Sequence, residues 1–271
     1  MMRRLPTNDR SNRLGRALDA PSGQFREANG RRSVDRAKQA PSDQPTRVVK
    51  TGTTTIGAVG SDGVVLAADT RASLGGRFVT NRRMRKIAPV GDRTAVAFAG
   101  SVSDAQAFVR RLRTELRLYE MRHGNSASVE TAATTAGDLV RRGPYRVLDL
   151  VLAGVDEEPS VYDIGQGGGV MQSDYAASGS GMQLAYGTLE GAYEPGLPVS
   201  ELATVVSEAV RNATERDTAS GDGITVATIT DEALDLDAYD GVDSAIASIT
   251  DSASGSGAGS IGGEESNGEV A

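Results

Sequence analysis

Apolar residues are spread unevenly along the chain and divide it into three parts. Residues 1–46 carry only isolated apolar side chains with no helical or strand period, so burial cannot offset the entropy lost on ordering. From Val48 the sequence is rich in β-branched and apolar residues. Beyond Asp231 it turns to Asp, Ser, Gly and Ala, which predicts a disordered acidic tail over residues 237–271. One ordered domain is therefore expected at 53–236.

The start of this domain predicts a β-hairpin. Residues 53–59 and 64–68 have the β-branched composition of strands, and Asp62-Gly63 between them is a favoured hairpin turn. Further strands are predicted at 94–99, 147–155, 161–164 and 224–229, with one more ending at Ser178.

Helical periodicity follows the strand at 94–99. Apolar residues recur at about every fourth position, which predicts a long helix capped near Ser103 or Asp104 and ended by Gly124. This order of elements favours an α+β fold, with antiparallel sheets between layers of helices, over a doubly wound parallel sheet. Other helices are predicted at 128–142, around 184–189 and from about 200.

Composition narrows the possible chemistry. The 271 residues include no Cys and a single His, which excludes a disulfide framework, a thiolate nucleophile, a Cys-based metal site and a cluster of His ligands. We therefore expect no metal and no other cofactor. No stretch reaches the ~18–20 apolar residues of a membrane span, and the leader lacks the apolar core of a secretory signal, so a cytoplasmic protein with no membrane partner is expected.

The formal net charge of −7 combines two oppositely charged segments. Residues 1–52 hold 12 basic and 5 acidic side chains, which gives +7, whereas residues 53–271 hold 17 and 31, which gives −14. A basic leader suits a transit peptide or a nucleic-acid-binding arm, although its acidic residues weaken both interpretations. The acidic remainder, with Arg in place of Lys, is typical of a cytoplasm of molar salt, where the Debye length falls to ~3 Å.

Two features that suggest chemistry have simpler explanations. His123 falls in the last turn of the predicted long helix, where a capping role is favoured. The glycines within 165–169 lack the Lys-Ser or Lys-Thr ending of a phosphate-binding loop, so we interpret them as a turn between strands.

The junction between the basic leader and the first strand reads Gly52-Thr53-Thr54-Thr55. Three threonines are by themselves ordinary strand residues. A second interpretation is that cleavage after Gly52 frees Thr53 as a new N-terminus, which places a hydroxyl nucleophile and an α-amine of pKa ~7.7–8.0 on one residue. Such a site needs neither His nor Cys.

Asp69 and Lys86 favour the second interpretation. Asp69 ends the strand that is predicted to pair with the one starting at Thr53. The compact charge of a Lys side chain can keep the neighbouring α-amine of a freed Thr53 near neutrality, and it can donate a hydrogen bond to a hydroxyl oxygen. The side chain of Arg is broad, planar and always protonated. Lys86 is the only Lys after residue 53, so its retention among Arg residues indicates a specific role.

Together these residues resemble the proteasome β-subunit family of N-terminal-nucleophile hydrolases, in its archaeal form. The resemblance spans roughly residues 53–231 in the family's order and implies a four-layer αββα sandwich of two antiparallel sheets. The matching text is Thr53-Thr54-Thr55-Ile56-Gly57, Ala67-Ala68-Asp69-Thr70-Arg71, Arg85-Lys86-Ile87, Ala99-Gly100, Ala177-Ser178-Gly179-Ser180-Gly181 and Glu215-Arg216-Asp217-Thr218-Ala219-Ser220-Gly221.

The resemblance implies a threonine endopeptidase. Thr53 would be the nucleophile and its freed amine the general base, acting through a water. Asp69 and Lys86 would ease removal of the hydroxyl proton, and the backbone N–H of Gly100 would stabilise the oxyanion. The family's leader is removed when its own Thr attacks the preceding carbonyl, and Gly52 offers no side chain to obstruct that attack.

Further positions carried over from the family lie around the amine and line the substrate pocket. Ser180, Asp217 and Ser220 match residues near the amine and hydroxyl, although a turn residue and a helix cap explain the first two equally well. The pocket is expected to be uncharged and mostly apolar, which favours an apolar side chain before the cut. Its expected lining is Ala72, Met84, Ala88, Phe98 and Val102.

The resemblance also implies partners. The expected assembly is a seven-membered ring of β subunits flanked by rings of α subunits, which degrades unfolded proteins delivered by an AAA ATPase, with no nucleic-acid partner. Two other hypotheses stay open: a catalytically silent β-type ring subunit, and a nucleic-acid-binding protein that keeps its basic arm.

Overall fold

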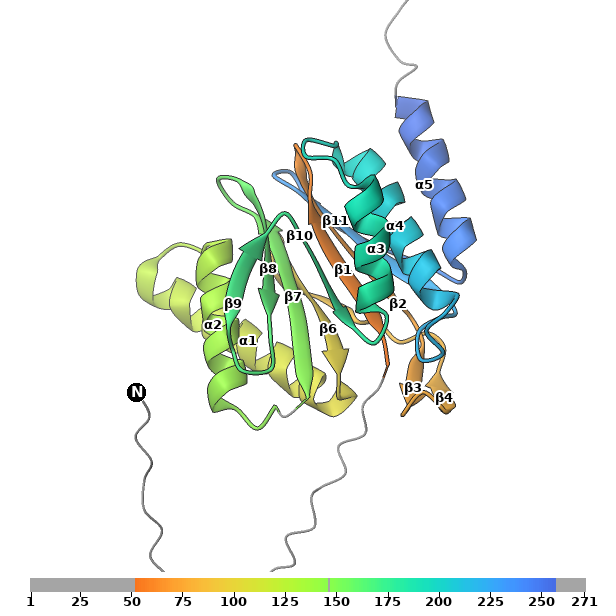
Figure 1. Cartoon of the computed structure of the whole chain (residues 1–271). Coiled ribbons are helices and arrows are strands. Elements are labelled where there is room, and N and C mark those ends of the chain that lie inside the picture. Colours follow the sequence, from red (N-terminus) through yellow and green to blue (C-terminus); the bar gives the residue numbers. More distant parts are fainter. Residues whose placement is uncertain (1–51, 146, 257–271) are drawn as a thin grey trace, which may run out of the picture. The chain divides into compact units, whose positions relative to one another are not determined.

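The computed structural model describes residues 52–145 and 147–256, with side chains described to Ser252. The predicted leader up to residue 51 and the last part of the predicted tail, residues 257–271, lie outside the described residues. Within them the strands form two five-stranded sheets and a separate two-stranded hairpin, with antiparallel pairing throughout (Figure 1).

The first sheet carries the hairpin predicted at the start of the domain. Its β1 (Thr54–Val59) and β2 (Gly63–Asp69) pair in the register Thr55↔Ala68 to Val59↔Val64, which matches the predicted strands. In spatial order its strands are β10 (Tyr175–Gly179), β1 (Thr54–Val59), β2 (Gly63–Asp69), β11 (Ile224–Thr230) and β12 (Leu234–Tyr239).

The second sheet is a meander in which each strand pairs with the next one along the chain. The glycine-rich stretch at 165–169 joins its last two strands. It forms the predicted turn, in which Gly168 N donates to Gly165 O at 2.8 Å. The strands are β5 (Ile87–Gly91), β6 (Thr94–Gly100), β7 (Leu148–Val155), β8 (Pro159–Ile164) and β9 (Val170–Ser173).

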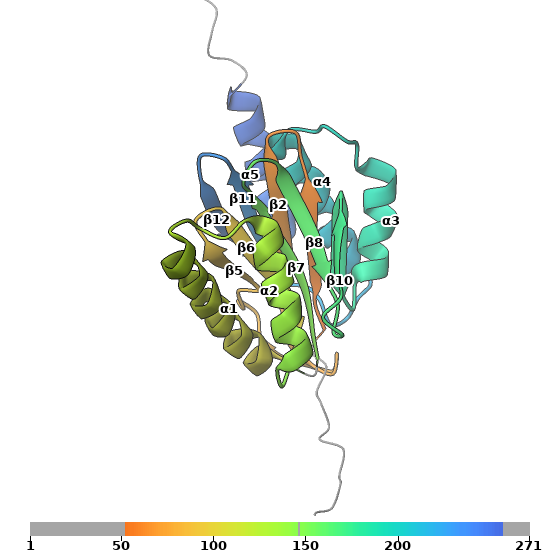
Figure 2. The same ribbon diagram turned by 90° about the vertical axis from the view of Figure 1, so that its left-hand side faces the viewer.

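Two helices cover the outer face of the second sheet (Figure 2). α1 (Val102–His123) and α2 (Val129–Arg142) each begin after a serine whose side chain accepts from the backbone of the first turn. The cap of α1 is Ser101, slightly before the predicted Ser103 or Asp104, whereas its end at Gly124 agrees with the prediction. Gly124 has φ 77°, a left-handed conformation that Gly adopts without steric cost.

The remaining helices lie against the first sheet, on the side opposite α1 and α2 (Figure 1). They are α3 (Met182–Ala192), α4 (Val199–Thr214) and α5 (Val242–Ser256). The prediction of disorder from residue 237 is therefore wrong as far as residue 256. Val242 and Ala245 of α5 are buried among the apolar residues between the first sheet and the helices, and this burial offsets the entropy cost of ordering the segment.

Three apolar clusters fill the spaces between neighbouring layers. One lies between α1, α2 and the second sheet, one between the first sheet and α3, α4 and α5, and the third between the two sheets, where Leu66 and Val151 meet. The order helix, sheet, sheet, helix confirms the predicted αββα sandwich.

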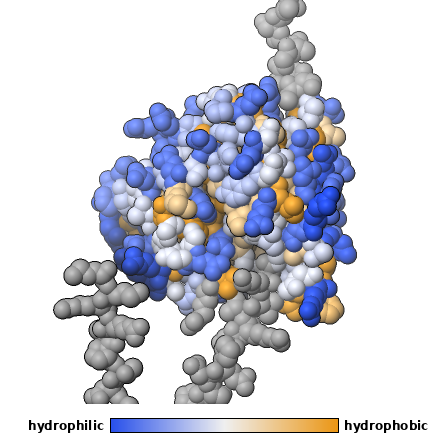
Figure 3. Space-filling model, in the orientation of Figure 1, coloured by the Kyte–Doolittle hydropathy of each residue, from blue (hydrophilic) through white to orange (hydrophobic). Residues whose placement is uncertain are grey.

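The hairpin of β3 (Ala72–Leu74) and β4 (Phe78–Asn81) was not predicted. Leu74, Phe78 and Val79 are exposed on it, so its strands lack the half-buried alternation that marks a strand in a sequence. Figure 3 shows apolar atoms at the lower right, where this hairpin lies in Figure 1, and further apolar patches across the middle of the same face. None of the described helices is long and apolar enough to cross a membrane.

Candidate active site

Antiparallel pairing brings the start of β1 next to the ends of two other strands. Thr54 lies opposite Gly179 of β10, and Thr55 lies opposite Ala68 of β2. The residue before β1, Thr53, therefore meets Asp69 at the end of β2 and Ser180 just after β10. The topology thus gathers residues that are far apart in the sequence at one end of the sandwich.

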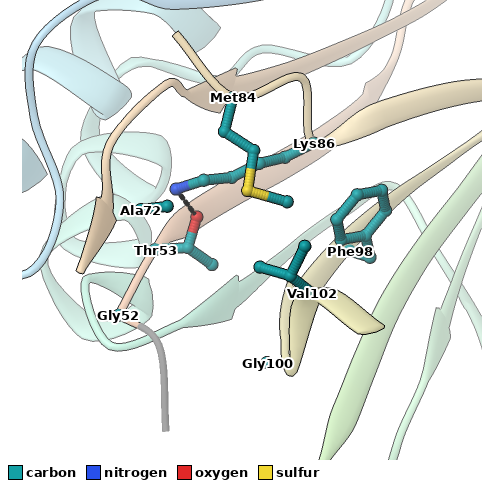
Figure 4. A pocket seen from close by; sticks show the side chains of 8 residues that line it. All are labelled: Gly52, Thr53, Ala72, Met84, Lys86, Phe98, Gly100 and Val102. Atoms are coloured by element: carbon teal, nitrogen blue, oxygen red, sulfur yellow. Dashed lines mark hydrogen bonds between the residues drawn. The ribbon is translucent and has the colours of Figure 1, made fainter. Parts of the chain in front are cut away.

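Asp69 and Lys86 hold the hydroxyl of Thr53. Thr53 Oγ1 donates to Asp69 Oδ1 at 2.8 Å, and Lys86 Nζ donates both to Thr53 Oγ1 and, at 2.7 Å, to Asp69 Oδ1 (Figure 4). The same carboxylate oxygen accepts the backbone N–H of Thr54 at 2.9 Å. A hydroxyl between an ammonium and a carboxylate loses its proton more readily than one in water, because the ammonium stabilises the alkoxide.

The other carboxylate oxygen of Asp69 is held by backbone groups. Asp69 Oδ2 accepts from Arg71 N at 3.1 Å and from Gly221 N at 2.9 Å. The carboxylate is fully buried, so these bonds replace the water that it would otherwise bind. They also fix the direction in which Oδ1 faces Thr53 and Lys86.

Lys86 is 3% exposed and reaches the site from the segment before β5. Burial lowers its pKa below the ordinary 10.5, although the adjacent Asp69 carboxylate acts in the opposite direction. Burial thus makes the charged form of Lys86 less favourable, and the ion pair with Asp69 partly compensates for the water that the ammonium loses.

A second acidic residue organises the backbone nitrogen of Thr53. Thr53 N donates to Ser180 Oγ at 3.1 Å, and Ser180 Oγ donates to Asp217 Oδ2. Ser220 Oγ donates to the same carboxylate oxygen at 2.6 Å. Asp217 also accepts Ala219 N at 3.2 Å, so it stabilises the turn after α4 as well as binding both serines.

Gly52 is packed closely against this turn. A Cβ at position 52 would lie 1.8 Å from Ala219 Cβ and 2.9 Å from Ser180 Oγ, which no side chain can accommodate without movement of the backbone. The peptide bond between Gly52 and Thr53 therefore lies directly beside the hydroxyl, the lysine and the serines described above.

A pocket opens beside Thr53, and most of the predicted lining residues border it (Figure 4). Ala88 does not. It lies opposite Val96, farther along β6 from Gly100 than Phe98 is, and it packs against the core beneath α1. The lining consists of Gly52, Thr53, Ala72, Met84, Lys86, Phe98, Gly100 and Val102.

Gly100 ends β6 at the rim of this pocket. It has φ 125°, and a Cβ there would lie 2.1 Å from Val147 O, so the position accepts only Gly. Gly100 and Thr53 therefore border the same pocket, and the backbone at Gly100 carries no side chain there.

His123 lies outside this site, in the exposed last turn of α1. Its Nδ1 donates to Tyr119 O at 2.9 Å, and its ring stacks on that of Tyr119 with centroids 4.0 Å apart. This agrees with the predicted role at a helix end. Among the described residues, no group of three or more His, Asp or Glu side chains could hold a metal ion.

Sequence reasoning missed the side chain of Thr54. Its Oγ1 lies 2.9 Å from Ser220 Oγ and is fully buried, and a Cβ on Gly181 would come within 2.1 Å of that oxygen. The signal in the sequence was the Gly-Ser-Gly motif itself, since glycine permits such a close approach. Only the fold reveals which hydroxyl uses the space.

Comparison with known proteins gives a consistent result. The family described as "Proteasome subunit" matches residues 49–229. "Proteasome subunit beta 2" of Haloterrigena turkmenica is 48% identical over 205 residues, 75% of this chain and 86% of that protein. "Proteasome subunit beta" of Halomicrobium mukohataei is 50% identical over 194 residues, 71% of this chain and 82% of that protein. These matches cover most of the domain, which confirms the resemblance found in the sequence: the chain belongs to the proteasome subunit family and is similar to the β subunits of halophilic archaea.

Proposed function

We propose that this chain is a catalytic β subunit of a proteasome core particle, a threonine endopeptidase that activates itself by cleaving between Gly52 and Thr53. The observation that carries the proposal is the contact of one hydroxyl, Thr53 Oγ1, with a buried lysine and a buried carboxylate beside the Gly52–Thr53 bond. A structural subunit has no need of a buried Lys86–Asp69 pair at this place, since desolvation makes such pairs costly to maintain.

Self-cleavage would begin with attack of Thr53 Oγ1 on the carbonyl carbon of Gly52. The C–N bond breaks, the nitrogen takes up the proton that Oγ1 gives up and leaves as the α-amine of Thr53, and the leader remains attached as an ester. Water then hydrolyses the ester, which releases the leader with a carboxylate at Gly52. Ser180, which accepts the N–H of Thr53 in the uncleaved chain, is in place to hold the new amine.

Hydrolysis of a substrate would use the same groups. The free amine of Thr53 takes the hydroxyl proton through a water, and Oγ1 attacks the substrate carbonyl to form an acyl ester while the amine product leaves. Lys86 stabilises the developing alkoxide, and the backbone N–H of Gly100 stabilises the oxyanion. Water then hydrolyses the acyl ester and restores Thr53.

The pocket supports a preference for apolar residues before the cut. Met84, Phe98 and Val102 present uncharged side chains to the pocket (Figure 4). A charged substrate side chain would lose its hydration there without gaining a partner.

Family membership implies assembly with α subunits into a core particle. We further propose that this chain forms seven-membered β rings, receives unfolded proteins from an AAA ATPase through the α rings, and works in the cytoplasm. The acidic charge of residues 53–271 suits a cytoplasm of high salt.

The direct test is the substitution Thr53→Ala in the full chain, produced together with its α subunits. We expect wild-type particles to contain chains that start at Thr53 and to hydrolyse a fluorogenic peptide with an apolar residue before the cut. The variant should keep its leader and be inert. Thr114→Ala, on the exposed face of α1, is a control that should match the wild type.

The alternatives give different results. A silent structural subunit predicts inert wild-type particles, and a nucleic-acid-binding arm predicts chains that keep Met1 in the assembled protein. Either result, or normal hydrolysis by Thr53→Ala, would contradict the proposal.

A further inference from the structure

Thr53 and Thr54 each bind two clusters of residues, one around the Asp69 carboxylate and one around the Asp217 carboxylate. The two threonines use opposite atoms for these contacts. The hydroxyl of Thr53 binds Asp69, whereas its nitrogen binds Ser180 and through it Asp217. Thr54 has the reverse arrangement, with its nitrogen on Asp69 Oδ1 at 2.9 Å and its hydroxyl in the Asp217 cluster. Adjacent residues on a strand point to opposite faces, which is why two consecutive threonines can serve both clusters.

The hydrogen-bond directions in the Asp217 cluster follow from its carboxylate. Ser180 and Ser220 both donate to Asp217 Oδ2, which only accepts. Ser220 has therefore used its one proton, and in its contact with Thr54 it must accept. Thr54 Oγ1 is then the donor, at 2.9 Å, and a chain of donors runs from Thr54 through Ser220 to Asp217.

The surroundings of the Thr54 hydroxyl are built for this contact. Thr54 and Ser220 are both 0% exposed, so water cannot replace either partner. Gly181 leaves the space that the hydroxyl occupies, because a Cβ there would lie 2.1 Å from Thr54 Oγ1. In turn Gly181 N donates to Thr53 O at 3.3 Å, which fixes the backbone between the two threonines.

From this geometry we infer that Thr54 is a positioning residue of the proposed peptidase: its hydroxyl orients Ser220, and through Asp217 and Ser180 it sets the place of the Thr53 nitrogen. The inference rests on the proposed function, since it concerns the same site. Thr54 lines no part of the substrate pocket, so its effect falls on the chemical step and not on substrate binding.

The test compares Thr54→Val with Thr54→Ser in assembled particles. Val keeps the shape and removes the hydroxyl, whereas Ser keeps the hydroxyl and removes the methyl group. We expect Thr54→Val to lower kcat per chain starting at Thr53 by about tenfold with KM within about twofold, because small misplacements of a reacting group slow the chemical step. Thr54→Ser should restore kcat to within about twofold of the wild type.

Thr55→Val is the matched control. Thr55 is also fully buried on β1, but its hydroxyl donates to Ser178 O at 3.4 Å, outside both carboxylate clusters. It should keep the wild-type kcat. If Thr54→Val does not assemble, Thr54→Ala removes the same hydroxyl without adding an atom, and the same comparison with Thr54→Ser applies.

The outcomes separate the two proposals. Inert wild-type particles would contradict the proposed function itself. Active wild-type particles together with a Thr54→Val variant of unchanged kcat, or with a loss that Thr54→Ser shares, would overturn the positioning role alone. A loss of kcat that Thr54→Ser reverses and Thr55→Val lacks would establish it.

Discussion

Gly52 lies so close to Ala219 that a Cβ on residue 52 would stand 1.8 Å from the Cβ of Ala219. Ala219 belongs to the turn that also carries Asp217 and Ser220, so the residue before the proposed nucleophile is packed against the proposed machinery. Glycine at position 52 therefore does more than leave a carbonyl open to attack. It allows the peptide bond between residues 52 and 53 to lie against the turn that carries Ala219.

Gly52→Ala should accordingly slow removal of the leader by about tenfold or more, because the backbone must shift and the carbonyl moves away from Thr53 Oγ1. The measurement is the intact mass of the chain over time after assembly begins. Gly187→Ala is the control: this exposed glycine of α3 has no atom within 4 Å of an added Cβ. Removal of the leader at the wild-type rate in Gly52→Ala would show that the contact with Ala219 has no role in cleavage.

Lys86→Arg tests whether charge alone suffices at the nucleophile. Lys86 Nζ reaches both Thr53 Oγ1 and Asp69 Oδ1 from a buried position, where the broader guanidinium cannot take the same place. We expect kcat for peptide hydrolysis to fall by about 10²-fold or more. The reverse exchange at an exposed ion pair, Arg111→Lys, should leave activity unchanged. Substantial activity in Lys86→Arg would contradict the proposed role of the ammonium.

Asp222 should make stability depend on pH. Burial acts to raise its pKa, but the bonds to Arg71 and Arg82 outweigh burial and hold the pKa below the ordinary 3.8. The Asp222 carboxylate therefore binds a proton less readily in the folded state than in the unfolded state. Its charged form stabilises the fold above pH ~4, and this stabilisation is lost as the pH falls through the lowered pKa. Asp222 also has φ 65°, which Asn tolerates as well as Asp.

The corresponding variant is Asp222→Asn, which keeps the backbone conformation and removes the charge. Its thermal unfolding midpoint should lie below that of the wild type at pH 7, with a loss of about 1 kcal/mol, and the gap should close toward pH 3. The pH series is run at one fixed salt concentration, because salt screens the exposed Arg82 partner. A gap that stays constant down to pH 3 would refute the assignment.

Sequence patterns predicted elements whose burial is periodic and whose ends carry caps. α2 is capped by the predicted Ser128 and ends at the predicted residue 142, and the β1–β2 hairpin follows its Asp-Gly turn. The β3–β4 hairpin and α5 escaped prediction for physical reasons. All four residues of β4 are exposed and β3 has only three residues, so neither strand shows a half-buried alternation. α5 is rich in Ser, Ala and Asp, so its apolar contacts with the core are hidden in a polar composition.

Some residues of the candidate site could be predicted from the sequence and others could not. Thr53, Asp69 and Lys86 were predicted from residue type and order to act together, and the fold brings their side chains into contact. Ala88 was assigned to the pocket, whereas the register opposite Val96 places it farther along the strand. The hydroxyl of Thr54 could not be assigned, because its partner Ser220 lies 166 residues away and only the folded chain brings them together.

The last prediction concerns α5, the helix in the segment that the composition assigned to a disordered tail. Ala245 is fully buried in the cluster between the first sheet and the helices, so Ala245→Asp places a carboxylate among apolar side chains. We expect a loss of about 3 kcal/mol or more in the free energy of unfolding, which lowers the thermal midpoint of the chain. Ser248→Asp adds the same charge on the exposed face of the helix and should change the midpoint little. Equal midpoints for the two variants would mean that α5 does not pack on the domain in solution, and that the segment behaves as the tail its composition suggests.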